Sequence, residues 1–207
     1  MSRNNVVFAL VAILAATAGV LLARGMLDAQ RPLQATVTSG TLLDPPRPLP
    51  ALTLVDQDER PFTLDRLHDR WTLLFFGFTN CPDICPATLS TLAQLEKSLQ
   101  DLPEQQRPRV VLISVDPERD TPRQLASYVK FFSPTFTGVT GTQASIDEFA
   151  RAMGVPVAIS KTENTYTVDH SAAIFLIDPQ AGLRALFSTP HEPSAIGADY
   201  RRIVAHR

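Results

Sequence analysis

Two cysteines, four residues apart, are the side chains best suited to chemistry in this sequence. Cys81 and Cys85 are the whole cysteine content of the 207-residue chain and lie in the segment TNCPDICP, residues 79–86. Pro86 fits best near the first position of a helix, because proline lacks an N–H and its ring clashes one turn back. Cys85 would then lie at the helix start, where the helix dipole favours a thiolate. Two thiols this close can form a local disulfide or together bind a soft metal ion.

The residues alone leave several uses of this pair open. Buried cysteines can be inert hydrophobic side chains, but two in one polar loop between prolines argue against that interpretation. Thioredoxin-type redox chemistry normally uses a C-x-x-C spacing, and the additional residue here favours a metal site. A thiol peroxidase would need an arginine that activates its thiolate, and no arginine adjoins either cysteine in the sequence.

A metal site would need a third ligand besides the two thiolates. Of the four histidines, His170 is the strongest candidate, because it comes just before the apolar segment 172–177. If residues 172–177 form a strand of a thioredoxin-like sheet, the loop before that strand faces the loop that holds Cys81 and Cys85. The alternative is a structural histidine whose ring nitrogens only form hydrogen bonds. Asp169 is placed to orient the imidazole. The remaining histidines fit surface, capping or terminal positions: His68, His191 and His206.

The candidate ligand set also limits the metal. Two thiolates and one imidazole suit Cu(I), which prefers soft ligands, and zinc is a further option. Structural zinc sites usually have four ligands, whereas three candidates are found here. A three-ligand site near a surface loop leaves the metal accessible for transfer, as a carrier protein requires.

The elements that position these residues follow from the hydrophobic pattern. Apolar runs at 71–78, 109–115 and 172–177 are typical of strands covered on both faces. Amphipathic or capped segments predict helices at 89–102, from Thr121, at 145–153 and at 193–205, and hairpins are expected at 52–64 and 172–187. This order predicts an α/β three-layer sandwich with a mixed central sheet, which is the element order of a thioredoxin-like fold.

Composition excludes other classes of protein. Hydrophobic residues make up 44% and charged residues 19% of the chain, which excludes wholesale disorder. The net charge of −2 gives no electrostatic footprint for nucleic acid, so no nucleic-acid partner is expected. Two cysteines are too few for a stabilising disulfide framework.

The N-terminal region predicts a membrane attachment. Residues 6–23 contain no charged side chain, and about 18–20 apolar residues can span a bilayer. We therefore expect a retained transmembrane anchor over residues 1–24, with a cleaved signal peptide as the alternative, since Ala16-Thr17-Ala18 fits a cleavage site. Residues 25–47 are rich in proline and predict a semi-rigid spacer before a globular domain over 48–207.

Three separated motifs resemble the Sco/SenC family. They are FGFTNCPDICP at 76–86, SVDPERDTP at 114–122 and VDHS at 168–171, in this order along the chain. The resemblance implies a thioredoxin-like domain on an N-terminal anchor. It also implies that Cys81, Cys85 and His170 bind copper, as Cu(I) and in some states as Cu(II).

The same resemblance implies a function and a location. Members act as membrane-anchored copper chaperones that take copper from an upstream donor to the binuclear copper centre of cytochrome c oxidase subunit II. Some are thiol–disulfide reductases of that subunit's cysteines, in which case Cys81 and Cys85 form the redox-active pair. The implied location is the bacterial inner (cytoplasmic) membrane, crossed once, with the globular domain in the periplasm. The acidic loop at 116–120 would be either a docking rim or, more ordinarily, loop and N-cap residues.

Overall fold

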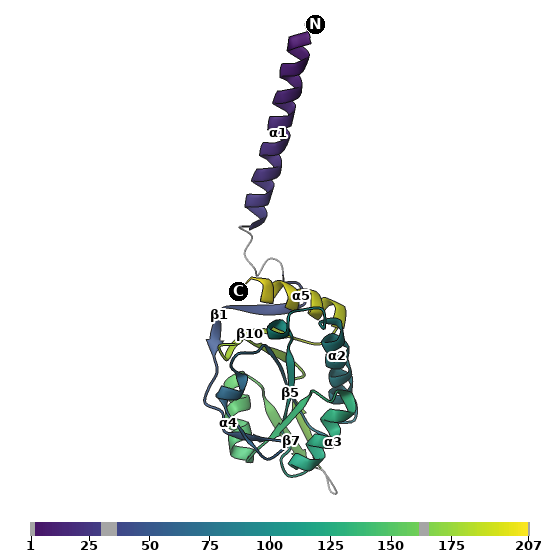
Figure 1. Cartoon of the computed structure of the whole chain (residues 1–207). Coiled ribbons are helices and arrows are strands. Elements are labelled where there is room, and N and C mark those ends of the chain that lie inside the picture. Colours follow the sequence, from purple (N-terminus) through teal and green to yellow (C-terminus); the bar gives the residue numbers. More distant parts are fainter. Residues whose placement is uncertain (1–2, 30–36, 162–165, 207) are drawn as a thin grey trace. The chain divides into compact units, whose positions relative to one another are not determined.

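The computed structural model describes residues 3–29, 37–161 and 166–206, and of residues 3–7, 9–11, 25–29 and 159–170 it describes no side chains. The chain divides into two compact units, one up to residue 36 and one from Val37 onward. The first unit contains the helix α1 (Arg3–Ala29) (Figure 1), which includes the uncharged run at 6–23. Among the described residues, no helix combines the length and the apolar character needed to cross a membrane.

The second unit is built on a mixed sheet of eight strands, in the order β1-β10-β9-β4-β5-β6-β2-β3. The pairs β4–β5 and β5–β6 are parallel, whereas the other neighbours are antiparallel. The mixed α/β fold predicted from the sequence is therefore confirmed. The strands are β1 (Gly40–Pro48), β2 (Leu54–Asp56), β3 (Pro61–Phe62), β4 (Thr72–Gly77), β5 (Arg109–Ser114), β6 (Thr137–Thr140), β9 (Ile174–Ile177) and β10 (Gly182–Phe187).

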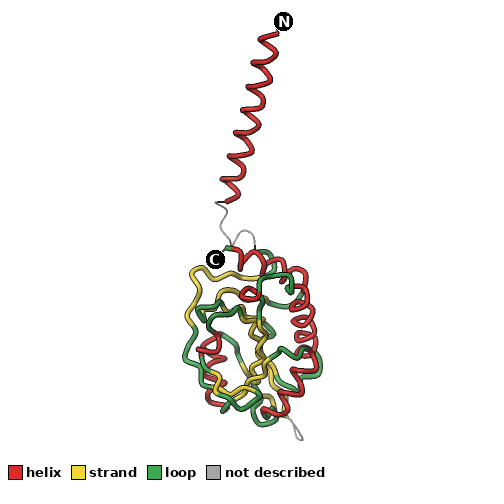
Figure 2. The backbone as a smooth tube through the Cα atoms, in the orientation of Figure 1, coloured by secondary structure: helices red, strands yellow, loops and turns green. Residues whose placement is uncertain are grey.

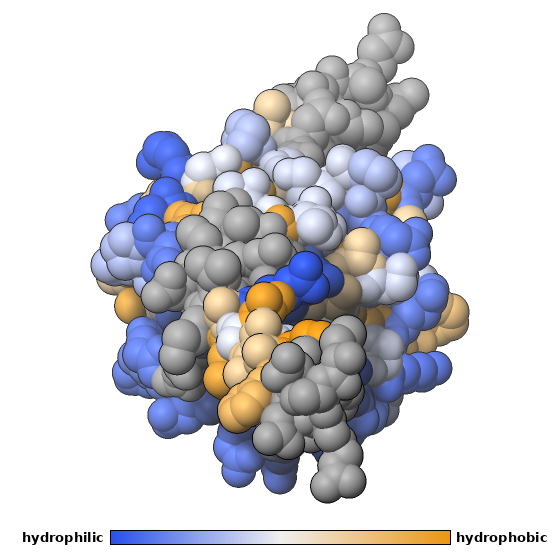
Figure 3. All heavy atoms as spheres, turned by 90° about the horizontal axis from the view of Figure 1, so that it is seen from above, coloured by the Kyte–Doolittle hydropathy of each residue, from blue (hydrophilic) through white to orange (hydrophobic). Residues whose placement is uncertain are grey.

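The central strands are the apolar runs of the sequence. All residues of β4 and β9 are buried, as are those of β5 after its first residue. Continuous apolar runs are expected where helices cover both faces of a sheet. Figure 2 shows helices on either side of the central strands, and Figure 3 shows hydrophilic residues around the rim of the visible face with hydrophobic ones nearer its middle.

Helices lie on both faces of this sheet. They are α2 (Ile84–Ser98), α3 (Pro122–Phe132), α4 (Gln143–Met153) and α5 (Pro193–Ala205). The helix α2 contacts both α3 and α5, whereas α4 lies on the opposite side of the sheet (Figure 1). On that side the ring of Phe149 in α4 lies 5.9 Å from the ring of Phe76 in β4. The capping box predicted at the start of α3 is present, since the Thr121 side chain accepts a hydrogen bond from the Gln124 backbone.

The stretch 25–47, predicted as a spacer, contains most of β1. This strand pairs with β10 at the edge of the sheet, and its register shifts between Leu42 and Arg47. Prolines are tolerated on edge strands and at such irregularities, because no further strand needs their missing N–H. The compact unit thus begins well before residue 48.

A buried carboxylate fixes the start of this unit to its last helix. Asp199 in α5 accepts hydrogen bonds from the backbone nitrogens of Thr38, at 2.9 Å, and Ser39, at 2.6 Å. Burial raises the pKa of Asp199, but the hydrogen bonds from Ser39, Thr38 and Arg202 outweigh it and hold that pKa below its ordinary value.

Two further strands lie outside the main sheet. The antiparallel pair β7 (Val157–Lys161) and β8 (Tyr166–His170) forms a separate two-stranded sheet. The sequence pattern predicted neither of them, and it also missed β6. All three are only four or five residues long, so they carry little periodicity.

Candidate functional site

The cysteine loop lies where β4 ends. The strand ends at Gly77 and α2 begins at Ile84, so Cys81 is in the connecting loop and Cys85 is the second residue of the helix. This matches the placement expected from Pro86. Binding sites of α/β sheets gather outside the carboxyl ends of the parallel strands, and β4 and β5 are such strands. Both cysteines are buried and neither forms a disulfide.

The two cysteines contact each other. The backbone nitrogen of Cys85 donates a hydrogen bond to the Sγ atom of Cys81 at 3.4 Å. The first amides of a helix have no partner within the helix, and the side chain of Asp83, at the N-cap position, does not supply one. The sulfur of Cys81 therefore takes the capping role, and this holds it at the start of α2.

The environment of Cys85 disfavours its thiolate form. Burial raises the pKa of Cys85 far above its ordinary value, and the hydrogen bond with the Cys81 side chain raises it further. A hydrogen bond with the Phe78 backbone lowers it, whereas the charges of Cys81 and Asp120 raise it. The expected preference for a thiolate at the helix start is thus outweighed by burial. A metal ion would have to displace this proton.

His170, the third predicted ligand, ends β8. Its backbone lies opposite Val157 in the β7–β8 pair, and its side chain is outside the described part of the structure. Among the described side chains, no three histidine, cysteine, aspartate or glutamate residues are grouped so as to hold a metal ion. Two other histidines contact backbone carbonyls: His191 that of Phe187 at 3.3 Å, and His206 that of Arg202 at 2.8 Å.

The family model described as SCO1/SenC matches residues 45–205. The chain belongs to the SCO1/SenC family.

Relatives in this family are described as copper-binding or were solved with copper bound. A Stutzerimonas stutzeri protein described as copper-binding is 42% identical over 152 residues, which are 72% of this chain and 73% of that protein. The crystal structure of Arabidopsis thaliana ScoI with copper bound superposes with a TM-score of 0.70 at 33% identity, covering 76% of this chain and 98% of that one. The chain covers 43% of the length of an Arabidopsis mitochondrial SCO1 homologue and 44% of a human one.

One structural relative is described by a disulfide and not by copper. BsSco, named as a member of the Sco family of cytochrome c oxidase assembly proteins and reported with a disulfide switch, superposes with a TM-score of 0.64. Its identity is 25%, and the match covers 80% of this chain and 99% of BsSco. The eight-stranded mixed sheet of this chain is therefore the thioredoxin-like Sco fold.

Sequence reasoning did not single out Gly77, which lets Cys85 approach the sheet of this Sco domain. A Cβ atom on Gly77 would lie 2.9 Å from a ring carbon of Phe75, 3.0 Å from a methyl carbon of Leu112 and 3.1 Å from the Sγ of Cys85. All three distances are shorter than comfortable contacts. A glycine inside an otherwise apolar strand often marks such a close approach, and this is the signal that could have identified it.

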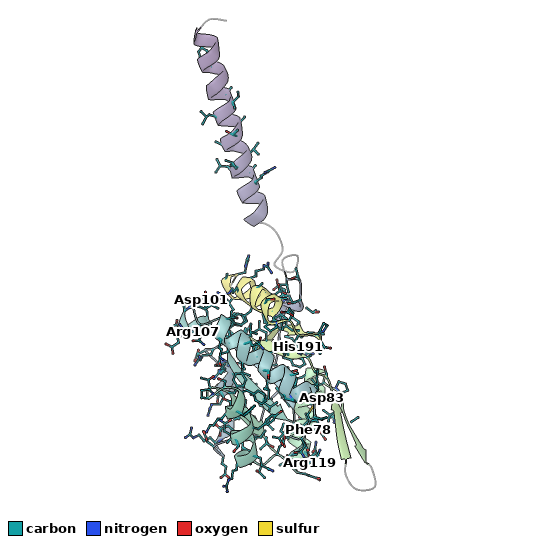
Figure 4. The ribbon with its side chains drawn as sticks, turned by 90° about the vertical axis from the view of Figure 1, so that its right-hand side faces the viewer. Phe78, Asp83, Asp101, Arg107, Arg119 and His191 are labelled. Carbon is teal, nitrogen blue, oxygen red and sulfur yellow. The ribbon has the colours of Figure 1, made fainter. Side chains whose placement is uncertain are left out.

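The acidic loop after β5 turns inward at two of its three acids. Asp116 and Asp120 are buried, whereas Glu118 is exposed. The Nε of Arg119 donates a hydrogen bond to Asp116, and its guanidinium lies 5.8 Å from the centre of the Phe78 ring. Figure 4 shows Phe78, Asp83 and Arg119 at the same end of the domain. Asp116 and Asp120 therefore support the loop as buried groups, and they do not form an exposed docking rim.

Proposed function

We propose that this Sco-family chain is a copper chaperone. The thiolates of Cys81 and Cys85 and the imidazole of His170 bind Cu(I), and the chain delivers it to the binuclear copper centre of cytochrome c oxidase subunit II. The contact between the Cys85 amide and the Cys81 sulfur, at 3.4 Å, carries this proposal. It holds two soft ligands together just beyond the carboxyl end of the central strand β4. The copper described for the relatives supports the choice of metal.

The ligand types suit transfer. Cu(I) favours thiolates and imidazole over oxygen ligands, and its binding releases the thiol protons. Three ligands leave the ion open to a ligand of the acceptor protein. The metal then passes by stepwise ligand exchange, in which each new bond to copper replaces one from this chain and no electron is transferred. Cu(II) would bind at the same residues with a further ligand.

The proposed partners follow from the family. BsSco is named among cytochrome c oxidase assembly proteins, and this supports the oxidase subunit as the acceptor. A chaperone also needs a source of copper, so we include an upstream copper donor.

We further propose that α1 anchors the chain in the bacterial inner membrane. The absence of charge over residues 6–23 supports this, as does the helical conformation of that stretch within Arg3–Ala29. The globular domain then works in the periplasm, with the segment between α1 and Val37 as its tether. This is the compartment in which the oxidase subunit would present its copper site.

A thiol–disulfide reductase is the second candidate function. It is favoured by the same pair, since neither cysteine is in a disulfide and their side chains share a hydrogen bond. In that reaction Cys81 and Cys85 would lose two electrons and two protons and form a disulfide. The disulfide of subunit II would take up both and become two thiols.

One experiment with two arms separates these functions. In the first arm, the Cu(I)-loaded chain is mixed with the reduced copper domain of subunit II, and the copper on each protein is measured after separation. In the second, the metal-free reduced chain is mixed with the oxidised domain, and the thiols of that domain are counted. The chaperone proposal expects copper transfer that a Cys81→Ser, Cys85→Ser double variant cannot perform. Disulfide reduction without copper transfer would contradict it in favour of the reductase.

A further inference from the structure

Asp120 joins the cysteine loop to the loop that follows β5. It is fully buried, and its carboxylate accepts hydrogen bonds from two directions. The backbone nitrogen of Thr79 donates to Oδ2 at 3.0 Å, and the Thr79 hydroxyl donates to Oδ1 at 2.5 Å. The Ser114 hydroxyl donates to Oδ2 at 2.6 Å. One carboxylate therefore connects the ends of two neighbouring parallel strands, because Ser114 ends β5 and Thr79 follows β4.

Hydrogen bonds within its own loop fix the position of Asp120. Its backbone nitrogen donates to the carbonyl of Asp116 at 2.9 Å, and the next residue, Thr121, caps α3. The Ser114 hydroxyl oxygen also accepts a hydrogen bond from the backbone nitrogen of Asp116, at 3.0 Å. The loop that carries Asp120 is thus internally braced. Its carboxylate can restrain Thr79, whose hydroxyl also lies 3.2 Å from the Oδ1 of Asn80.

Thr79 in turn lies next to the first cysteine. The backbone nitrogen of Cys81 donates to the carbonyl of Phe78 at 3.4 Å and so closes a tight turn around Thr79 and Asn80. A displacement of Thr79 would change this turn. It would thereby move the sulfur of Cys81 relative to the amide of Cys85, to which it is hydrogen-bonded.

Holding a loop with a buried carboxylate costs desolvation free energy. Removing an ionised group from water costs several kcal/mol unless hydrogen bonds compensate, and an apolar side chain of similar volume often stabilises a fold as well or better. Such a group is therefore suited to fixing a geometry more than to adding stability.

We propose that Asp120 is a positioning residue for the cysteine pair. Through Thr79 it fixes the start of the loop 79–85 and so sets the geometry in which Cys81 and Cys85 meet a metal ion. This inference rests on the proposed function for its copper-binding consequence. The restraint on the loop itself is a property of the metal-free protein.

The cleanest test changes Thr79 and leaves Asp120 in place. The pKa of Cys85 depends mainly on burial and on hydrogen bonds with Cys81 and Phe78, and the charge of Asp120 also raises it. Neutralising Asp120 would therefore change both the geometry of the loop and the pKa of Cys85. Thr79→Val removes the hydroxyl donor and keeps the shape and the backbone N–H, whereas Thr79→Ser keeps the donor. Thr142→Val is the matched control, because the Thr142 hydroxyl caps the remote helix α4 through a hydrogen bond from the Ser145 backbone at 3.2 Å.

The full-length chain is measured in detergent, with two readouts for each variant. The first is the rate at which iodoacetamide alkylates each cysteine in the metal-free protein, resolved by mass spectrometry. The second is the Cu(I) affinity by competition with a chromogenic chelator. We expect Thr79→Val to change the ratio of the two alkylation rates several-fold and to weaken Cu(I) binding about tenfold, which is typical for partners that orient metal ligands. Thr79→Ser and Thr142→Val should keep the wild-type values.

The outcomes separate this inference from the proposed function. Wild-type alkylation rates in Thr79→Val would overturn the positioning role, whatever the copper result. Equal changes in Thr79→Val and Thr142→Val would also overturn it, because they would reflect a general loss of stability. If the wild-type chain binds no Cu(I), the proposed function fails, and the alkylation ratio alone then decides the positioning role.

Discussion

The Sγ atom of Cys81 lies 3.4 Å from the backbone nitrogen of Cys85 and accepts its hydrogen bond. The same sulfur that is proposed to bind copper thus also caps α2. Metal binding and the start of this helix are therefore coupled, since a sulfur that turns toward a metal changes its contact with the helix.

The capping role predicts an effect of Cys81 on stability without any metal. Cys81→Ala should lower the free energy of unfolding of the metal-free protein by about 1 kcal/mol, the usual effect of losing an N-terminal cap. Cys81→Ser keeps an acceptor and should lose less. Both are measured by urea denaturation. Asp83→Ala is the control, because that side chain makes no capping hydrogen bond. A larger loss in Asp83→Ala than in Cys81→Ala would contradict the assignment.

The close packing around Gly77 predicts that a larger residue there lowers both stability and Cu(I) affinity. In Gly77→Ala the new methyl group would meet Cys85 and Leu112, so we expect a loss of about 1–3 kcal/mol in unfolding free energy together with weaker Cu(I) binding. Gly154→Ala is the matched control. Gly154 has φ of 78° with open space around its Cα, so alanine there costs about 1–2 kcal/mol through backbone strain alone. Copper affinity that falls equally in both variants would contradict the role of Gly77.

Asp199 predicts a dependence of stability on pH. Its pKa is lowered in the folded state, because the hydrogen bonds from Ser39, Thr38 and Arg202 outweigh burial. Its contribution is therefore fully present above the unfolded-state pKa of about 3.9 and is lost as the pH falls through the lower folded-state pKa. Asp199→Asn should be less stable than wild type near pH 6, and the difference should shrink toward pH 3. Urea denaturation at both pH values measures it, and a difference that stays constant would refute this linkage.

His170 separates metal binding from disulfide chemistry. His170→Ala should weaken Cu(I) binding strongly while changing the reduction potential of the Cys81–Cys85 pair little, because the histidine is proposed as a ligand and not as a redox group. The potential is measured in glutathione redox buffers with the full-length chain. A large shift in potential with unchanged copper affinity would favour the reductase function instead.

Local sequence signals were sufficient for the elements around the cysteine loop. The apolar runs identified β4, β5 and β9, since strands covered on both faces need such runs. Pro86 placed Cys85 at a helix start, because proline is excluded from helix interiors. The helix begins at Ile84, ahead of the leucine pattern from Leu89 that predicted it, because a leucine stripe marks only the buried face.

The features that sequence reasoning missed depend on contacts between distant parts of the chain. The strand β1 exists because Gly40 and its neighbours pair with residues near Phe187, and no local pattern encodes that partner. The Thr79–Asp120 contact spans 41 positions. The raised pKa of Cys85 follows from burial by the assembled fold, which outweighs the local helix dipole.

The most direct test of the account is a Cu(I) competition titration of the full-length chain in detergent. Wild type is compared with Cys81→Ser, Cys85→Ser and His170→Ala, and with His191→Ala as a control histidine that contacts the Phe187 carbonyl. The proposed copper site predicts that one Cu(I) binds per chain. Each of the three ligand variants should lose more than about 100-fold in affinity, beyond the effect of an orienting partner, while His191→Ala should keep the wild-type value. Undiminished affinity in either cysteine variant, or equal losses in the two histidine variants, would contradict it.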